Sequence, residues 1–316
     1  MRPRGVVKVG IVDMNAGHVN QAIRCMGVIV EQFASRVRDA NPGLEVELVH
    51  VSPRDKREAP PDDCDLFLAS GGPGSPFDGD GEPWVDDFAR FLDRVVDANH
   101  AGQDAPGALC ICYSFEMAVR HFGVAEVAPR ASRKFGVMPV YTTDEGRDHP
   151  LLASFGDRLF AFEHRNWEAV GLDPSALARH GGKLLARESR DEAASKGAGL
   201  MAFDFAPGVE GVQFHPEADR PGVVAWVERP DQAEAFKEAY GITTYERMLK
   251  TLDDPNRLAR TFALLIPGWM TRRFNRIAGA RGWKPLGAPT TDMMTFGSMV
   301  PNPPADRPSR KSRVAR

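Results

Sequence analysis

Cysteine is scarce in this chain of 316 residues, which contains only four: Cys25, Cys64, Cys110 and Cys112. A long chain with so few cysteines is not a disulfide scaffold, so we expect all four thiols to be reduced. The histidines lack a metal-ligand spacing such as H-x-x-x-H. We therefore expect neither a metal nor another cofactor.

Long apolar runs and a dominant charge sign are also missing. No stretch approaches the ~20 apolar residues that a membrane helix needs, and Lys8, Gly10 and Asp13 interrupt the apolar run near the N-terminus, unlike a signal peptide. The net charge of −3 gives no basic field that would attract nucleic acid or an anionic membrane. We expect a cytoplasmic protein with a small substrate.

Alternating apolar strands and amphipathic helices dominate the first part of the chain. Apolar runs at 8–14, 44–51, 65–70 and 107–112 predict strands, and stretches at 18–40, 84–99 and 114–123 have the periodicity of helices. This order predicts an α/β fold with a mostly parallel sheet flanked by helices on both faces. At 42% hydrophobic residues, the chain can fill a sizeable core.

From about Val137 the pattern changes to strands separated by polar turns, which predicts a small antiparallel or mixed section added to the parallel sheet. After Glu217 the sequence predicts two or three short helices, the first over residues 243–252. One is expected to begin at Pro255, and Pro267 and Gly282 are expected to punctuate the others.

Three segments follow from these changes in composition. Residues 1–225 form the predicted α/β domain and residues 226–286 a helical C-terminal extension. Residues 287–316 are rich in proline, serine and arginine, so we expect a disordered tail.

The segment LCICYSFEM, residues 109–117, contains two of the four cysteines. We expect Cys110 and Cys112 to point to opposite faces of the sheet, which argues against a mutual disulfide and against a shared metal. Cys110 is then a small buried apolar residue. Cys112 falls where the strand gives way to a helix, whose N-terminus stabilises a thiolate. Taken alone, however, a cysteine at a strand end is more often structural.

The segment GVEGVQFHPEAD offers a general base for such a thiol. His215 ends a predicted strand and Glu217 follows two residues later, so in extended backbone both side chains project on the same side. The Glu217 carboxylate can then hold the His215 tautomer and stabilise the imidazolium. The alternative is a solvated turn without catalytic meaning.

The segment SGGPGSP, residues 70–76, follows a predicted strand. Its glycines would let backbone N–H groups approach a substrate closely, as an oxyanion hole requires. A phosphate-binding loop and a plain turn are the alternatives.

Together, SGGPGSP, ICYSFEM and GVQFHPE, in this order, resemble the signature of the class I glutamine amidotransferase family. The resemblance is greatest to stand-alone relatives of the GMP synthetase glutaminase domain, and it covers roughly Val7 to Ala218. It implies a flavodoxin-like α/β fold.

The resemblance also implies roles for individual residues. Cys112 would be the nucleophile, His215 the general acid/base and Glu217 its orienter. The backbone around Gly72 and the N–H of Tyr113 would form the oxyanion hole. Gly72, Pro73 and Glu116 would contact the substrate.

The implied activity is hydrolysis of the glutamine side-chain amide through a γ-glutamyl thioester. No complete ATP-binding motif follows Glu217, so we expect the ammonia to pass to a synthetase on another chain. The chain departs from the family at Cys110 and Ser114, where glycine is usual, and at Glu116, where glutamine is usual. The turn at Cys112, with Phe115 and Glu116 after it, also resembles the corresponding segment of the γ-glutamyl hydrolases. Such a hydrolase, or a catalytically weak partner-binding homologue, is therefore the alternative.

Overall fold

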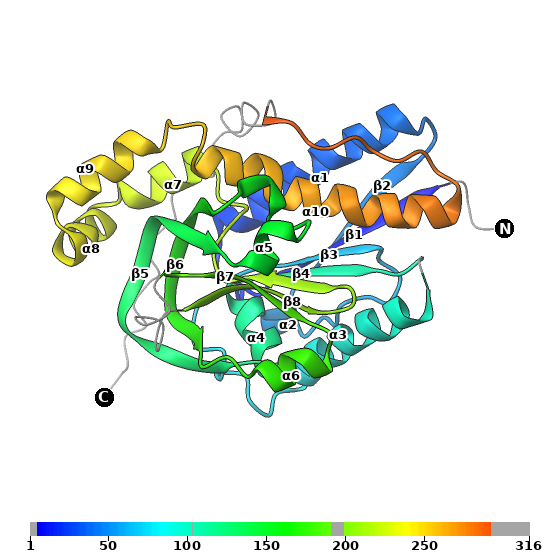
Figure 1. The fold of residues 1–316 in the computed structure, drawn as a ribbon, viewed down its shortest axis with the longest axis horizontal. Coiled ribbons are helices and arrows are strands. Elements are labelled where there is room, and N and C mark those ends of the chain that lie inside the picture. The colour runs from blue at the N-terminus through cyan, green and yellow to red at the C-terminus, as the bar shows by residue number, and fades with distance from the viewer. Residues whose placement is uncertain (1–4, 103, 191–198, 292–316) are drawn as a thin grey trace, which may run out of the picture.

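The computed structural model describes residues 5–102, 104–190 and 199–291. Within them, nine strands form one sheet in the order β2-β1-β3-β4-β9-β8-β7-β5-β6 (Figure 1). The predicted α/β class is confirmed, with a parallel part, an antiparallel section and a helical C-terminal part.

The parallel part of the sheet comprises five strands, in which β1 pairs with β2 and β3, and β4 pairs with β3 and β9. The two central strands β3 and β4 are buried along their whole length, as their uninterrupted apolar sequences predict. The bounds are β1 Val6–Val12, β2 Glu45–Val51, β3 Leu66–Ala69, β4 Gly107–Ile111 and β9 Val209–Val212.

The antiparallel section comprises β5 Glu126–Thr142, β6 Arg158–Val170, β7 Lys183–Arg187 and β8 Leu200–Ala206. The long hairpin of β5 and β6, here called the β5–β6 arm, stands at the left of Figure 1. The arm curls back over the sheet, because Phe162 in β6 forms an antiparallel bridge with His215, just beyond the end of β9. One strand of the arm therefore supports a predicted site residue.

Helices cover both faces of the sheet. On one face, α1 Gln21–Ala40 and α10 Leu258–Arg281 share an apolar cluster with β1, β3 and β4, and Phe33 meets Phe274 edge-on at 5.8 Å. On the other face, α3 Pro83–Ala101 and α4 Tyr113–Phe122 form a second cluster. The short helices are α2 Pro53–Lys56, α5 Asp144–Asp148, η1 Ala153–Phe155 and α6 Pro174–Arg179.

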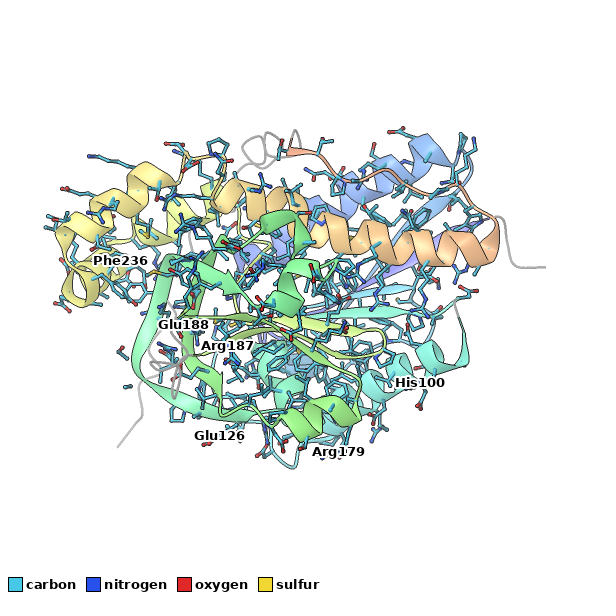
Figure 2. The ribbon with its side chains drawn as sticks, in the orientation of Figure 1. His100, Glu126, Arg179, Arg187, Glu188 and Phe236 are labelled. Atoms are coloured by element: carbon cyan, nitrogen blue, oxygen red, sulfur yellow. The ribbon has the colours of Figure 1, made fainter. Side chains whose placement is uncertain are left out.

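Three further helices pack beside the β5–β6 arm: α7 Arg220–Val227, α8 Pro230–Tyr240 and α9 Ile242–Thr251. They share a separate apolar cluster with the arm, in which Phe236 of α8, labelled in Figure 2, meets Phe135 of β5 at 5.2 Å. The sequence signal had predicted α9 but neither α7 nor α8.

Two helix predictions in the C-terminal part are wrong. The helix expected to begin at Pro255 begins at Leu258, and Pro267 lies inside the continuous helix α10 rather than between two helices. An internal proline costs a helix roughly 3 kcal/mol. Large side chains on both sides of it, such as Ile266 and Trp269, are buried against the sheet, and this burial outweighs the cost. Gly282 ends α10 in the left-handed conformation, as predicted.

The proposed division into residues 1–225, 226–286 and 287–316 stays a prediction. Helix α7 runs through its first boundary, and most of the predicted tail, residues 292–316, lies outside the described residues. Among the helices that the structure describes, none is both long and apolar enough to cross a membrane.

Candidate active site

Three of the sequence motifs meet at one edge of the sheet. SGGPGSP follows β3, Cys112 follows β4, and His215 lies just beyond β9. Since β3, β4 and β9 are neighbouring parallel strands, their carboxyl ends lie together. This is the edge at which open α/β sheets place their ligands.

Cys112 occupies a sharp turn between β4 and α4, with φ of 52° and ψ of −102°. Strand alternation would place residues two apart on the same face, but this left-handed backbone breaks it. Cys110 accordingly packs in the α3–α4 cluster and Cys112 in the α1–α10 cluster, as predicted. The Ser114 hydroxyl accepts a hydrogen bond from the Ile111 N–H at 2.7 Å and donates to the Ala69 carbonyl at 2.7 Å, which ties the turn to β3.

His215 is held at both its backbone and its ring. Its backbone N–H donates to the Phe162 carbonyl at 2.8 Å, and its ring Nδ1 lies 2.8 Å from Glu217 Oε1. Burial alone would lower the pKa of His215, but the Glu217 carboxylate and the adjacent Cys112 thiol outweigh burial and raise it well above its usual value. The structure thus brings Cys112, His215 and Glu217 together around a ring that favours the imidazolium form.

The glycine nearest to this group is Gly71, which the sequence analysis did not single out. A Cβ at Gly71 would lie 2.7 Å from His215 Cε1 and 3.3 Å from Cys112 Cβ. The predicted Gly72 instead packs against the β1–α1 connection, where a Cβ would lie 2.1 Å from the Met14 carbonyl oxygen. A side chain at either position would force neighbouring atoms to move, which accounts for a glycine at both.

Arg54 covers the residues next to Cys112 and was also missed. Its guanidinium lies 4.2 Å from the centre of the Tyr113 ring and donates to the Pro73 carbonyl at 2.8 Å. The Tyr113 hydroxyl donates to the Ser75 carbonyl at 3.3 Å. As the first residue of α4, Tyr113 has a backbone N–H without an acceptor inside the helix. No local sequence pattern links Arg54 to these residues.

Glu116 lies beneath the candidate site with only 3% of its surface exposed. The Gln213 side-chain amide, two residues before His215, donates to Glu116 Oε1 at 2.9 Å. Burial raises the pKa of Glu116 to about 7, although the hydrogen bond from Gln213 and the charge of Arg165 act in the opposite direction. Gln213 is a further residue near the site that was not singled out from the sequence.

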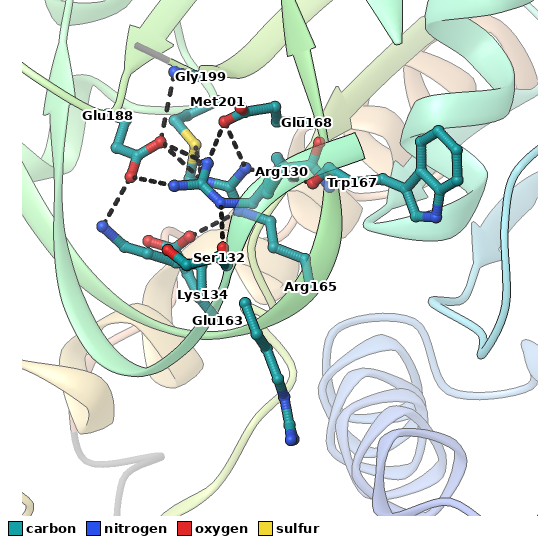
Figure 3. A network of polar contacts seen from close by, with 12 residues as sticks. Arg130, Ser132, Lys134, Glu163, Arg165, Trp167, Glu168, Glu188, Gly199 and Met201 are labelled. Atoms are coloured by element: carbon teal, nitrogen blue, oxygen red, sulfur yellow. Dashed lines mark hydrogen bonds and ion pairs between the residues drawn. The ribbon is translucent and has the colours of Figure 1, made fainter. Parts of the chain in front are cut away.

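A network of charged side chains braces the β5–β6 arm (Figure 3). Arg165 of β6 donates to Glu163 at 2.8 Å and to Glu188 at 2.9 Å, and Lys134 of β5 reaches Glu188 at 2.7 Å. Arg130 joins the same network. The network fixes the strand whose Phe162 carbonyl holds His215. Its members come from β5, from β6 and from Glu188 just after β7, so only the folded structure reveals it.

A cavity of about 710 Å³ lies elsewhere, at the ends of β5 and β7 beside α5, and is lined by charged side chains such as Arg147, Asp157 and Lys183. Cys112, His215 and Glu217 are not among its lining residues. Over the described part of the chain, no three or more His, Cys, Asp or Glu side chains are grouped so as to hold a metal ion.

Comparisons with known proteins agree with the fold. Solved structures with a similar fold include a glutamine amidotransferase from Thermotoga maritima, with 15% identity and a TM-score of 0.55, covering 86% of this chain and 99% of that chain. Another is a glutamine amido transferase from Methylobacillus flagellatus, with 15% identity and a TM-score of 0.52, covering 90% of this chain and 98% of that chain. No curated protein matches.

The family model described as "Glutamine amidotransferase class-I" matches residues 25–221. This segment is more than half of the chain and contains Cys112, His215 and Glu217. The chain therefore belongs to the class I glutamine amidotransferase family.

Proposed function

We propose that this chain hydrolyses the side-chain amide of glutamine with Cys112 as nucleophile, His215 as general acid/base and Glu217 as its orienter. The observation that carries the proposal is the position of the His215 ring, which contacts Glu217 at 2.8 Å and lies beside Cys112. A nucleophile, a base and an orienting carboxylate in this relation are what acyl transfer requires.

In the first step, the Cys112 thiolate attacks the γ-carbonyl carbon of glutamine. The C–N bond then breaks, and ammonia leaves with a proton donated by the His215 imidazolium. In the second step, a water molecule gives a proton to His215 and attacks the γ-glutamyl thioester. The C–S bond of the thioester breaks and glutamate leaves, so the Cys112 thiolate and the His215 imidazolium of the first step are restored.

The negative oxygen that forms in both steps needs N–H donors. We assign this role to the N–H of Tyr113 and to the backbone around Gly72. Two features support the assignment: the Tyr113 N–H has no acceptor inside α4, and the adjoining Gly71 packs directly against Cys112 and His215. The backbone at Pro73 and the Glu116 carboxyl are the proposed contacts to the glutamyl group.

Released ammonia is proposed to pass to a synthetase on another chain. Helices α7 to α10, which follow Glu217, pack on the arm and the sheet of the same fold. Over the described residues, these helices are therefore part of the fold that carries the proposed glutaminase site.

Glu116 favours a second candidate activity, the hydrolysis of γ-glutamyl peptides. The chemistry at Cys112 would be the same in both activities. A carboxylate at position 116, where the family places an amide, would favour a substrate that presents an amino group there.

The test is a side-by-side assay of the purified chain with glutamine and with a γ-glutamyl peptide. Ammonia release from glutamine that is absent in Cys112→Ala would support the glutaminase. Rapid peptide cleavage without ammonia release from glutamine would replace it with the second candidate. Equal turnover by Cys112→Ala and the parent would refute both activities at this site.

A further inference from the structure

The turn that carries Glu217 is connected to α1 through Asp219. Glu217 is only 1% exposed, and Oε1 is its oxygen at His215. Asp219 is 3% exposed and caps α7 by accepting a hydrogen bond from the Gly222 N–H at 2.8 Å. The same short segment therefore contains Glu217, the candidate orienter, and Asp219, the N-cap residue of α7.

Arg24 of α1 reaches this cap from the neighbouring helix. Its Nη2 lies 2.7 Å and 2.8 Å from the two carboxylate oxygens of Asp219, and its Nε donates to Gln21 Oε1 at 2.6 Å. The two helix starts are closely packed, because a Cβ at Gly222 would lie 2.8 Å from Asp219 Oδ1 and 3.4 Å from Arg24 Nη2.

The charges of this contact are fixed by its surroundings. Burial alone would lower the pKa of Arg24, but the hydrogen bond to Asp219 raises it, so the guanidinium stays charged. Burial and the charge of Asp219 raise the pKa of the adjacent Cys25 thiol, on which Glu217 also acts. Cys25 is thus a neutral neighbour of this contact. One electrostatic environment includes Arg24, Asp219, Cys25 and Glu217.

Two buried polar atoms in this environment lack a partner among the described residues: Arg24 Nη1, a donor, and Glu217 Oε2, an acceptor. Leaving a buried charged group unsatisfied is costly.

We propose that Arg24 and Asp219 are positioning residues that clamp the turn from His215 to Asp219 and so keep the Glu217 carboxylate on His215 Nδ1. The clamp acts through Glu217 and needs no contact with the substrate. Its effect on turnover rests on the proposed function, but its effect on the contact between His215 and Glu217 does not.

The alternative is an ordinary helix-cap ion pair, which would contribute only to stability. The pKa of His215 distinguishes such an ion pair from a positioning clamp. The groups that act on His215 directly are Glu217 and Cys112, and Glu116 and His164 interact with its charge. If the clamp is lost and Glu217 moves away, the pKa of His215 falls. If Glu217 stays in place, the loss of the Arg24 positive charge can only leave that pKa unchanged or raise it.

The experiment compares Arg24→Gln and Asp219→Asn with Arg36→Gln, a control on the same helix whose guanidinium bonds Thr271 and Gly287 instead. The pKa of His215 is measured by NMR of labelled imidazole, alongside kcat, KM and the melting temperature. We expect both clamp variants to lower the pKa of His215 by about one unit or more and kcat by about tenfold, with little change in KM. The control should leave the pKa of His215 unchanged.

A folded Arg24→Gln protein whose His215 pKa is unchanged or raised would overturn the proposal, even if its melting temperature fell. If Arg24→Gln does not fold, Arg24→Lys gives the readout instead, because it retains the charge, and a fall in the pKa of His215 can then come only from a displaced Glu217. Asp219→Asn accompanies it but does not decide, because the loss of the Asp219 charge would itself lower that pKa. If the parent chain releases no ammonia, the proposed function fails while the NMR titration still decides whether the clamp exists.

Discussion

Cys110 and Cys112 are both buried, yet their surroundings give the two thiols different chemistry. Cys110 lies within β4 among apolar side chains, and burial raises the pKa of its thiol to about 12, which keeps it protonated. Cys112 is the N-cap residue of α4 and lies against the His215 ring. The junction of strand and helix could be predicted from the sequence. The separation of the two side chains was also predicted, but its cause was not: it comes from the backbone turn at Cys112, which Ser114 and β3 hold in place.

Replacing Cys112 by Ala or Ser is expected to abolish turnover and labelling by a glutamine-like electrophile. Cys110→Ala is the matched control and should cost roughly 1 kcal/mol of stability while retaining labelling. Mass spectrometry of the labelled proteins and thermal unfolding would measure both effects. Labelling that persists in Cys112→Ala and disappears in Cys110→Ala would contradict the assignment.

Glu116→Gln is expected to stabilise the protein increasingly as the pH rises. Because burial raises the pKa of Glu116 from 4.5 to about 7, the native state favours the protonated form. The stability from that form is complete below the unfolded pKa and is lost as the pH rises to the folded pKa. The loss is on the order of 3 kcal/mol.

The glutamine introduced at position 116 retains the shape of Glu116 and can accept the hydrogen bond from Gln213, but it carries no charge. Its advantage in free energy of unfolding should therefore be small in mild acid and largest above neutrality. Urea unfolding at several pH values would measure it. An advantage that does not change with pH would show that Glu116 is not held in the neutral form.

At the scale of elements, periodicity was a reliable guide where a helix or strand has one apolar face. Helices α1, α3 and α4 were predicted in this way, whereas uninterrupted apolar runs predicted β3 and β4. Helix α10 was misjudged because Pro267 is a local signal, whereas the burial of Trp269 and its neighbours is a tertiary effect. The charged network of the β5–β6 arm was missed for a related reason, since Arg165 and Glu188 meet only after folding.

The loop after β3 provides a test at this scale. Gly71→Ala would place a methyl group 2.7 Å from His215 Cε1 and 3.3 Å from Cys112 Cβ, so the ring or the loop must move. We expect glutaminase activity to fall by at least about tenfold while the protein remains folded. Gly27→Ala in α1 is the control, because nothing lies within 4 Å of its added methyl group. Activity in Gly71→Ala equal to that of the control would show that the loop does not confine the ring.

At the scale of the whole molecule, the C-terminal helix α10 covers one face of the sheet. Helix α10 packs beside α1 on the sheet, as Phe33 and Phe274 show. The chain remains attached beyond α10, because Asn275 donates to the Leu286 carbonyl at 2.9 Å and Arg36 donates to the Gly287 carbonyl at 2.5 Å. The tail that the sequence predicts from residue 287 thus begins with residues that contact the folded core.

Two truncations would test whether α10 and the residues beyond 291 belong to the folded core. Ending the chain after Arg257 removes α10 and exposes one face of the sheet, so we expect an insoluble or unfolded product. Ending it after residue 291 removes a segment whose proline, serine and arginine content is typical of chain outside a core. This second protein should keep its melting temperature and activity. A soluble, cooperatively unfolding chain without α10 would show that the helix is an appendage.

The left-handed backbone of Cys112 bears on how this chain could change over evolutionary time. A residue with a side chain at φ of 52° and ψ of −102° carries strain of order 1–3 kcal/mol, which glycine would largely relieve. Substitution of Cys112 by glycine would thus raise the free energy of unfolding, and nothing would oppose it once the thiol was no longer needed. A lineage that abandoned the chemistry and kept the fold would be expected to lose this side chain early.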